Sequence, residues 1–288
     1  IIYVWIDALS NYITNIGYDI DGGDETFKKW WPADLHLIGK DIIRFHTIYW
    51  PIILMALDVE LPKQVFGHPW LLMGNDKMSK SKGNIVYADD LVDKYGVDAV
   101  RYYLLHEMPF ASDGTFTYEL LIESINSNLA NVLGNLVNRT IGMANKYFDG
   151  IVSDKGVYED IDNELKDMVL SLKDKVEDNM DKFRIADSLE NVLDIYRRCN
   201  KYIDETMPWV LAKNETMKER LATVLYNLVE GIRIGSVLLR AFMPETSEKI
   251  FYQINTELKE FDTINEFGKY ISGIKVNSPE VLFQRIEN

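Results

Sequence analysis

Residues 77–84 read KMSKSKGN, and this lysine-rich stretch follows an apolar run at residues 69–73 that is typical of a short strand. Between them, Gly74 to Asp76 favour a turn, because glycine and asparagine tolerate a positive φ and aspartate caps locally. A strand that leads into a loop of lysines and hydroxyl groups can hold anionic oxygens, since ammonium groups supply charge and hydroxyls donate hydrogen bonds. The alternative is a solvated basic turn on an otherwise acidic protein.

The same loop matches all five letters of the KMSKS signature and so resembles class I aminoacyl-tRNA synthetases. In that family, ATP loses pyrophosphate, and positioned ammonium groups stabilise the negative charge that builds on it. The resemblance implies that Lys80 carries most of this work and that Lys77 and Ser79 support it.

The composition bounds the class of protein. The chain has 288 residues, enough for about two domains, and its 47% of hydrophobic residues is typical of a globular protein with a core. The longest apolar run, residues 48–57, is too short to cross a bilayer, and no leader with a cleavage site is present. We therefore expect a cytoplasmic protein with no membrane partner. The strand-like start suggests that the chain begins inside a larger protein.

Charge and cysteine content exclude other classes. The net charge of −14 counts against a general nucleic-acid binder, which needs a basic surface to displace counterions from phosphates. Any contact with RNA must then use a localised basic or stacking patch. The single cysteine, Cys199, excludes an internal disulfide and a multi-cysteine zinc site, and it is expected to be a small core residue.

The predicted fold is α/β followed by mostly α. Over residues 1–67, strand and helix alternate, which favours a parallel sheet with ligands at the carboxyl ends of the strands. The expected strands are 1–6, 34–39 and 63–66, and the expected helices are 8–16 and 42–57. The second helix should be broken or kinked near Pro51, because proline has no N–H to donate.

Residues 68–117 contain the strand and the lysine loop. Two short helices are predicted next, residues 88–95 closed by Gly96 and residues 98–107 with Asp98 as the cap. A loop or short strand is predicted over residues 110–116.

After Thr117 the sequence becomes helical. Segments with helical periodicity run over about 118–148, 159–182, 185–206 and 215–255. Thr216 has capping-box spacing to Glu219, and Pro244 should bend or split the last segment. These features predict an antiparallel helix bundle. The last residues, from about 256, show no clear pattern.

Gly39 and Asp41 follow an apolar strand. A glycine there lets a ligand approach the backbone, and a carboxylate two residues later can accept from the vicinal hydroxyls of a ribose. The alternative is that Asp41 caps the helix that follows, which does not exclude ligand binding. Gly-x-Asp ahead of a KMSKS loop resembles the ATP-ribose element of class I synthetases, and the resemblance adds His68 to the ATP-binding set with Lys80.

A further set of residues could line an apolar pocket that contains two polar side chains. Its members are Trp5, Ala8, Leu9, Tyr12, Ile42 and His46. Such a pocket suits a thioether, because sulfur favours aromatic surroundings and makes only weak hydrogen bonds. Taken singly, each residue is more simply part of a core. As a set they resemble the amino-acid pocket of methionyl-tRNA synthetases, whose Trp-x-Asp-Ala-x-x-x-Tyr and Gly-Lys-Asp-Ile-x-x-Phe-His patterns are matched at residues 5–12 and 39–46.

Asn131, Asn135 and Arg139 recur at four-residue spacing and should share one helix face. Such residues are usually only solvated, but Pro208-Trp209 near a helix end requires burial or a partner for the indole. In methionyl-tRNA synthetases a matching Asn-x-x-x-Arg and a matching Pro-Trp read the CAU anticodon by hydrogen bonds and stacking. The resemblance therefore implies that these five residues bind the anticodon.

The resemblance covers nearly the whole chain and identifies it as the C-terminal part of a member of the methionyl-tRNA synthetase family. It implies the second half of a Rossmann-like catalytic domain over 1–67, a KMSKS and stem-contact region over 68–117, and an anticodon-binding helix bundle over 118–288. It implies ATP with Mg²⁺, L-methionine and tRNA(Met) as partners. The family's His-Ile-Gly-His signature and zinc-bearing insertion are missing from this sequence, so we expect no zinc site.

Two functions of different classes stay open. Either the chain supplies half of the active site of a methionine–tRNA ligase, or it acts by itself as a non-catalytic module that binds tRNA anticodons. A synthetase for leucine or isoleucine is less well supported, because Tyr12 and His46 suit a thioether.

Overall fold

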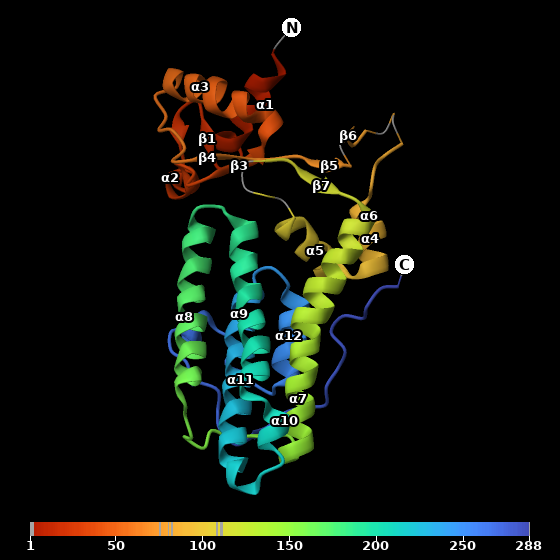
Figure 1. Cartoon of the computed structure of the whole chain (residues 1–288). Coiled ribbons are helices and arrows are strands. Elements are labelled where there is room, and N and C mark those ends of the chain that lie inside the picture. Colours follow the sequence, from red (N-terminus) through yellow and green to blue (C-terminus); the bar gives the residue numbers. More distant parts are fainter. Residues whose placement is uncertain are drawn as a thin grey trace. The chain divides into compact units, whose positions relative to one another are not determined.

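The chain divides into two compact units in a computed structural model (Figure 1). The structure describes residues 3–74, 76–79, 81, 83–107, 109 and 112–287. The first unit comprises Ile1–Leu71 with Ala111–Gly114, and the second comprises Leu72–Phe110 with Thr115–Asn288.

A parallel strand pair with helices forms the first unit. β3 (His36–Gly39) pairs with β4 (Val65–His68), and Gly39 lies opposite His68. This confirms the strands predicted at 34–39 and 63–66 and their parallel pairing. The other elements are α1 (Val4–Thr14), the antiparallel pair β1 (Tyr18–Asp19) and β2 (Gly22–Gly23), α2 (Glu25–Trp30), η1 (Lys40–Ile42), the π-helix η2 (Phe45–Tyr49) and α3 (Trp50–Ala56).

The predicted strand at residues 1–6 is wrong where the structure describes it, because residue 4 already belongs to helix α1. A short apolar run fits a buried strand and a buried helix equally well. Here Leu9 and Ile13 recur at four-residue spacing and are buried against Trp50 and Leu54, so a helix satisfies the core.

The helix predicted at residues 42–57 is confirmed, and its predicted disruption near Pro51 is the π-helical segment η2. Proline cannot donate a backbone hydrogen bond, and a π-bulge is one way in which a helix accommodates such a gap.

The lysine-rich stretch begins in the second strand of a hairpin. β5 (Leu71–Met73) pairs antiparallel with β6 (Asp76–Lys77), and β7 (Gly114–Phe116) completes a sheet of order β6-β5-β7. The predicted helices are confirmed as α4 (Ala88–Tyr95) and α5 (Val97–His106).

Asp98 does not cap its own helix, so that prediction is wrong. Its side chain is buried and accepts a hydrogen bond from the Thr246 backbone N–H at 2.6 Å, in the first turn of α12 (Pro244–Gln253). The carboxylate therefore satisfies a free N–H of a helix that is distant in sequence.

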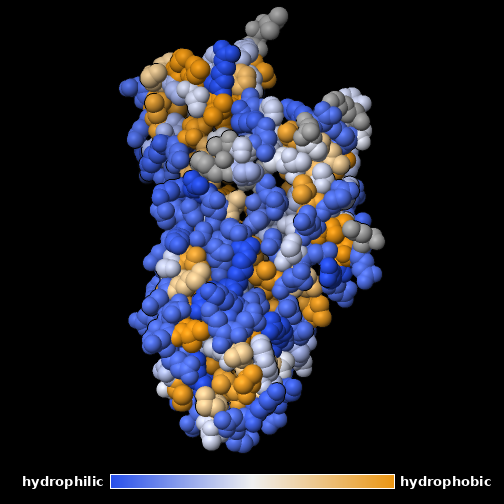
Figure 2. Space-filling view, viewed as in Figure 1, coloured by the Kyte–Doolittle hydropathy of each residue, from blue (hydrophilic) through white to orange (hydrophobic). Residues whose placement is uncertain are grey.

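The helical segments after Thr117 are confirmed, and the face viewed in Figure 2 is largely hydrophilic over them. They are α6 (Tyr118–Ser124), the π-helix η4 (Ile125–Gly134), α7 (Asn135–Phe148), α8 (Asp160–Asp181), α9 (Ile185–Thr206), α10 (Pro208–Leu211), η5 (Glu215–Met217) and α11 (Lys218–Leu239). Pro244 separates α11 from α12, as predicted. The capping box at Thr216 is wrong, because Asn214 Oδ1 accepts from the Thr216 N–H at 3.0 Å.

Helix α11 forms the core of the second unit, and nearly all of its residues are buried. Two glycines of α11 let α9 come close. A Cβ on Gly231 would lie 2.7 Å from Cys199 Sγ, and a Cβ on Gly235 would lie 2.8 Å from the Tyr196 ring. Cys199 is the buried core residue predicted, and burial raises its pKa to about 12. By length and composition alone this helix could cross a membrane, but its whole apolar window is buried inside the protein.

The tail after α12 is fastened to α11 by a buried ion pair. Arg233 donates from Nε to Glu230 at 2.7 Å, and neither side chain is exposed. Glu230 also accepts the backbone N–H groups of residues 268–270 at 2.8–3.2 Å. Arg233 also donates to the carbonyl oxygens of Leu258 and Thr263. The described tail contains two short regular elements, η6 (Phe261–Ile264) and β9 (Ile274–Lys275). Strand β9 pairs with β8 (Ile151–Val152).

His106 joins α5 to α9 through the carboxylate of Glu190 and also contacts that of its neighbour Glu107. Its ring nitrogens lie 2.8 Å from Glu107 Oε1 and 2.8 Å from Glu190 Oε2. Burial lowers the pKa of His106, but these two hydrogen bonds outweigh it and raise the pKa to about 9. The hydrogen bond from His106, with help from Arg197, lowers the pKa of Glu190 to about 2.

We predict that Glu230→Gln lowers the free energy of unfolding by about 3–5 kcal/mol, because it leaves the Arg233 cation buried without compensation. Urea denaturation measures the change. The matched control is Glu266→Gln, which breaks an exposed ion pair with Lys269 and should leave the free energy of unfolding nearly unchanged. Equal losses for the two variants would contradict this account.

The stabilisation contributed by His106 should depend on pH. Because its folded pKa of about 9 lies above the ordinary 6.5, its contribution is complete below pH 6.5 and is lost as the pH rises through 9. The Glu190 contribution is present above its ordinary pKa of 4.5 and is lost as the pH falls through 2. Denaturation of the wild type and of His106→Gln over this range should therefore differ most between pH 4.5 and 6.5. A difference that stays constant up to about pH 10 would disprove the pairing.

Candidate nucleotide, amino-acid and anticodon sites

Gly39, Asp41 and His68 lie together at the carboxyl ends of β3 and β4. A Cβ on Gly39 would lie 2.6 Å from Asp41 Oδ1 and 4.0 Å from His68 Nε2. The exposed carboxylate therefore folds back over the backbone at Gly39, where a larger side chain would have to displace it. Asp41 is not a helix cap, since Gly39 occupies the N-cap position of η1 and no side-chain cap bond forms.

His68 turns one nitrogen toward this group. Its Nδ1 lies 2.9 Å from the Pro69 carbonyl oxygen, which can only accept, so Nδ1 carries the proton. In the neutral ring Nε2 is then an acceptor near Gly39. A carboxylate and an imidazole at the ends of two parallel strands suit a ligand rich in hydroxyl groups.

Helix α1 presents Trp5, Ala8, Leu9 and Tyr12 on one face, because their spacing is three, four and seven residues from the first. Trp5 was expected at a strand end; instead its ring stacks on Phe45 at 3.8 Å between centroids. Within this face Leu9 is buried in the core, whereas Ala8 is exposed and Tyr12 is 36% exposed.

Tyr12, Ile42 and His46 are brought together by hydrogen bonds. His46 Nδ1 lies 3.1 Å from the Ile42 carbonyl oxygen and so must donate to it. Its Nε2 therefore accepts from the Tyr12 hydroxyl at 2.9 Å. Partial burial raises the pKa of Tyr12. The hydroxyl keeps its lone pairs for a ligand, and the aromatic rings around it suit a thioether.

His36 and Trp50 belong to the same group and were not identified from the sequence. Trp50 donates from Nε1 to His36 Nε2 at 3.2 Å, and the His36 and Tyr12 ring centroids are 4.4 Å apart. Burial, and next the proximity of His46, lower the pKa of His36 to about 4, so the ring is neutral at pH 7. The available signal was the alternation in β3, where His36 and Ile38 face inward and Leu37 is exposed.

The described part of the lysine-rich loop is closed by Asn84. Its Oδ1 accepts the Ser79 N–H at 2.8 Å, and its Nδ2 donates to the Lys77 carbonyl at 3.3 Å. The hydroxyls of Ser79 and Ser81 are 2.9 Å apart. Lys80, the residue expected to do most of the chemistry, lies outside the described residues.

Arg139 and Trp209 lie at the same end of the helical region. Arg139 of α7 places Nη2 3.9 Å from Asp204 of α9, two residues before that helix ends. Met207 turns the chain with φ 45°, Pro208 is buried at the start of α10, and Trp209 is 41% exposed. Exposed Asn135 lies one turn before Arg139 on α7, as predicted.

Asn131 lies four residues before Asn135, in the π-helical segment η4, and is exposed. That it shares a face with Asn135 and Arg139 stays a prediction. It lines a pocket of about 450 Å³ together with Ser127, Glu123 and Arg285 of the C-terminal segment.

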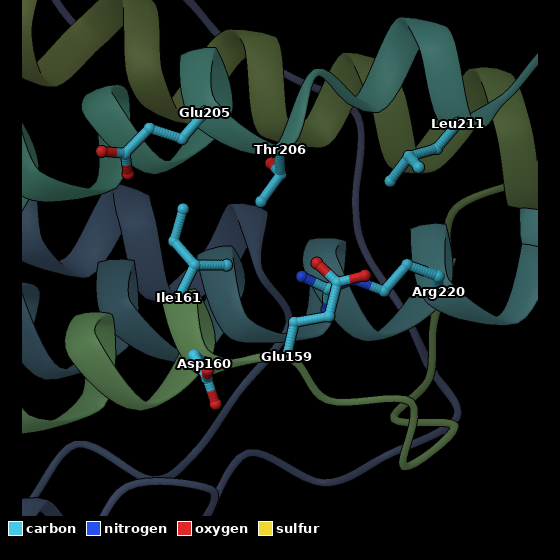
Figure 3. A pocket seen from close by; sticks show the side chains of 7 residues that line it. All are labelled: Glu159, Asp160, Ile161, Glu205, Thr206, Leu211 and Arg220. Carbon is cyan, nitrogen blue, oxygen red and sulfur yellow. The ribbon is translucent and has the colours of Figure 1, made fainter.

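A further pocket of about 360 Å³ lies at the α9–α10 corner, where Thr206 and Leu211 bracket Trp209 in sequence (Figure 3). The other lining side chains are Glu159, Asp160, Ile161, Glu205 and Arg220. Its one guanidinium, Arg220, is already paired with the buried carboxylate of Asp162 at 2.8 Å. No group of three or more metal-ligating side chains occurs in the part of the chain that the structure describes.

Comparison with known proteins links both units to one family. Residues 1–141 match the family model of class I tRNA synthetases (M), and residues 152–288 match that of the anticodon-binding domain of methionyl tRNA ligase. The chain is 58% identical to the methionine–tRNA ligase of Clostridium acetobutylicum over 287 residues and 52% identical to that of Bacillus subtilis over 291 residues. All of this chain is covered in both alignments.

Solved structures agree. A Mycobacterium tuberculosis methionyl-tRNA synthetase in complex with methionyl-adenylate superposes with a TM-score of 0.91 at 39% identity, covering 98% of this chain and 55% of that one. Its apo form gives a TM-score of 0.89 at 37% identity and covers 100% of this chain and 56% of that one.

The chain spans 44% of the length of the two curated relatives. Because the two family models account for most of its residues and the relatives and structures agree with them, the chain belongs to the methionyl-tRNA synthetase family of class I aminoacyl-tRNA synthetases.

Proposed function

We propose that this chain is part of a methionine–tRNA ligase, in which it supplies the KMSKS part of the active site and the recognition of the anticodon. The observation that carries the proposal is the exposed Trp209 indole at the same end of the helical region as the Arg139 guanidinium. On a protein with a net charge of −14, this local pairing gives RNA a stacking surface and a cation. Such a ligase would act in the cytoplasm.

The proposed reaction begins with the formation of methionyl-adenylate, the ligand bound to the Mycobacterium tuberculosis synthetase. The methionine carboxylate attacks the α-phosphorus of magnesium-bound ATP in line, and pyrophosphate leaves. Lys80, Lys77 and Ser79 stabilise the charge on the leaving group by position and electrostatics alone. A hydroxyl of the terminal ribose of tRNA(Met) then attacks the carbonyl carbon of the adenylate, which forms the methionyl ester and releases AMP.

Binding of the substrates divides between two groups of residues in the first unit. Asp41 accepts from the ribose hydroxyls of ATP, with Gly39 and His68 beside it. Tyr12 and His46, joined by their 2.9 Å hydrogen bond, orient the methionine side chain against the aromatic rings.

Anticodon recognition extends from Arg139 and Trp209 to neighbouring polar groups. Asn135 and Arg139 donate to base edges, and Trp209 stacks on an unstacked base. Pro208 fixes the start of α10 and so the direction of the indole. Asn131, which lies in η4, contributes a separate polar contact along the same RNA.

The alternative function is a module that binds anticodons without catalysis. It is favoured by the small parallel sheet of the first unit, since β3 and β4 are its members among the described residues. The two functions differ in whether the chain acts as part of a longer ligase that activates methionine or acts by itself as a binding module without catalysis.

Trp209→Ala should weaken the binding of an RNA hairpin with a CAU anticodon by about 1–3 kcal/mol, because one base loses its stacking partner. Fluorescence anisotropy with a labelled hairpin measures the affinity. The matched control is Trp30→Ala, which removes a 61% exposed indole from the first unit and should not change the affinity. Equal binding of a hairpin with a scrambled anticodon would end the assignment.

The carboxylate of Asp41 should determine selectivity for the ribose. We expect no methionine-dependent pyrophosphate exchange from this chain by itself and measurable exchange from the longer ligase. In that ligase, the wild type should reject 2′,3′-dideoxy-ATP relative to ATP, and Asp41→Ala should lose most of this discrimination because it no longer pairs with the hydroxyls. Exchange by the isolated chain would exclude the half-site assignment, and retained discrimination in Asp41→Ala would exclude the ribose contact.

A further inference from the structure

Lys40 separates Gly39 from Asp41 in sequence, yet its ammonium is held by other residues. Nζ lies 2.5 Å from Asp113 Oδ1 and 4.3 Å from the centre of the Trp70 ring. The same Asp113 oxygen accepts the Trp70 backbone N–H at 2.9 Å. One carboxylate oxygen thus joins the residue after Gly39 to a residue just beyond β4.

We infer that Lys40 is a positioning residue of the nucleotide site, and that its ion pair with Asp113 fixes the turn that presents Gly39 and Asp41. This inference rests on the proposed function, because it concerns how the ATP-binding turn is held. The contacts belong to the first unit, whose residues include Ala111–Gly114.

The geometry shows what the pair can hold in place. The backbone of Lys40 packs on β4, where a Cβ on Gly67 would lie 3.5 Å from the Lys40 Cα. Trp70 follows His68 by two residues, and its carbonyl oxygen accepts the Gly114 N–H at 2.9 Å. The Lys40–Asp113 pair therefore connects the carboxyl ends of the two strands that carry Gly39 and His68.

The competing role for Lys40 is direct contact with ATP phosphates. Its ammonium is already paired, and the hydrogen bonds from Lys40 and from the Trp70 N–H lower the pKa of Asp113, so that the partner carboxylate is ionised at pH 7. The side chains are 37% and 28% exposed. A pair this exposed contributes little to stability, so its effect is on the orientation of the turn.

A double-mutant cycle in the longer ligase separates the two roles. Lys40→Met keeps a side chain of similar length but removes the ammonium, and Asp113→Asn replaces the charged partner by a neutral amide. We expect each to raise the KM for ATP about 10-fold by misplacing the turn, with the KM for methionine unchanged. The double variant should cost no more than either single one, because the residues act as one unit. Lys40→Arg should restore most of the loss.

The matched control is Lys63→Met, which breaks another ion pair of the first unit. Lys63 and Asp34 are 2.6 Å apart and 64% and 87% exposed, and the kinetic constants should not change. A lower kcat in Lys40→Met with unchanged constants in Asp113→Asn would overturn the inference in favour of phosphate contact. Wild-type constants in both single variants would overturn it as well.

If the longer protein shows no pyrophosphate exchange, the proposed function is refuted. A second measurement then still tests the inference about Lys40. Hydrogen exchange of this chain should show the Trp70 amide protected in the wild type and in Lys63→Met. The protection should fall in Asp113→Asn, which replaces the carboxylate acceptor by a weaker amide oxygen, and also in Lys40→Met, which only loosens that acceptor. Full protection in Lys40→Met would show that the pair does not order this turn.

Discussion

The second unit depends on the close packing of α9 against α11. Gly231 and Gly235 leave space on α11, and Cys199 and Tyr196 of α9 fill it. This contact fixes the position of α9 along α11. Everything proposed for RNA follows from where that helix ends. In its last turns, Asp204 lies 3.9 Å from Arg139 of α7. The left-handed residue Met207 and the buried Pro208 follow, and the indole of Trp209 is exposed beyond them. In this way an acidic protein can present a stacking surface near a cation without a basic face, as the proposed RNA contact requires.

The first unit depends on a different constraint, the parallel register of β3 and β4. Because Gly39 lies opposite His68, the carboxyl ends of both strands lie side by side. Asp41 can then fold back over the glycine. A slip of one residue would turn these side chains to the other face of the sheet. The proposed sites thus differ in their structural basis: the ends of β3 and β4 for the ribose hydroxyls, α1 and η2 for the thioether, and the corner between α9 and α10 for the bases.

The sequence predicts features that depend on local periodicity and misses those that depend on distant partners. The helices after Thr117 and the parallel strands are predictable because each element repeats its own apolar spacing. The cap role predicted for Asp98 is wrong because its partner N–H lies on a helix almost 150 residues away. The π-helical segment that carries Asn131 is not predicted, because nothing in the local pattern reveals it. The motifs identify Tyr12 and His46, but the pairing of Asp113 with the nucleotide turn joins residues 73 apart in sequence.

The central claim is that the Trp209–Arg139 end of the helical region reads three bases of RNA. Nuclear magnetic resonance of the ¹⁵N-labelled chain tests it most directly, by titration with a hairpin that carries CAU and with one that carries a scrambled loop. The account predicts that CAU shifts the Trp209 indole N–H, the Arg139 Nε–H and the Asn135 amide group at the lowest RNA concentrations, while the scrambled loop leaves them in place. Shifts confined to other surfaces, or identical shifts with both hairpins, would contradict it.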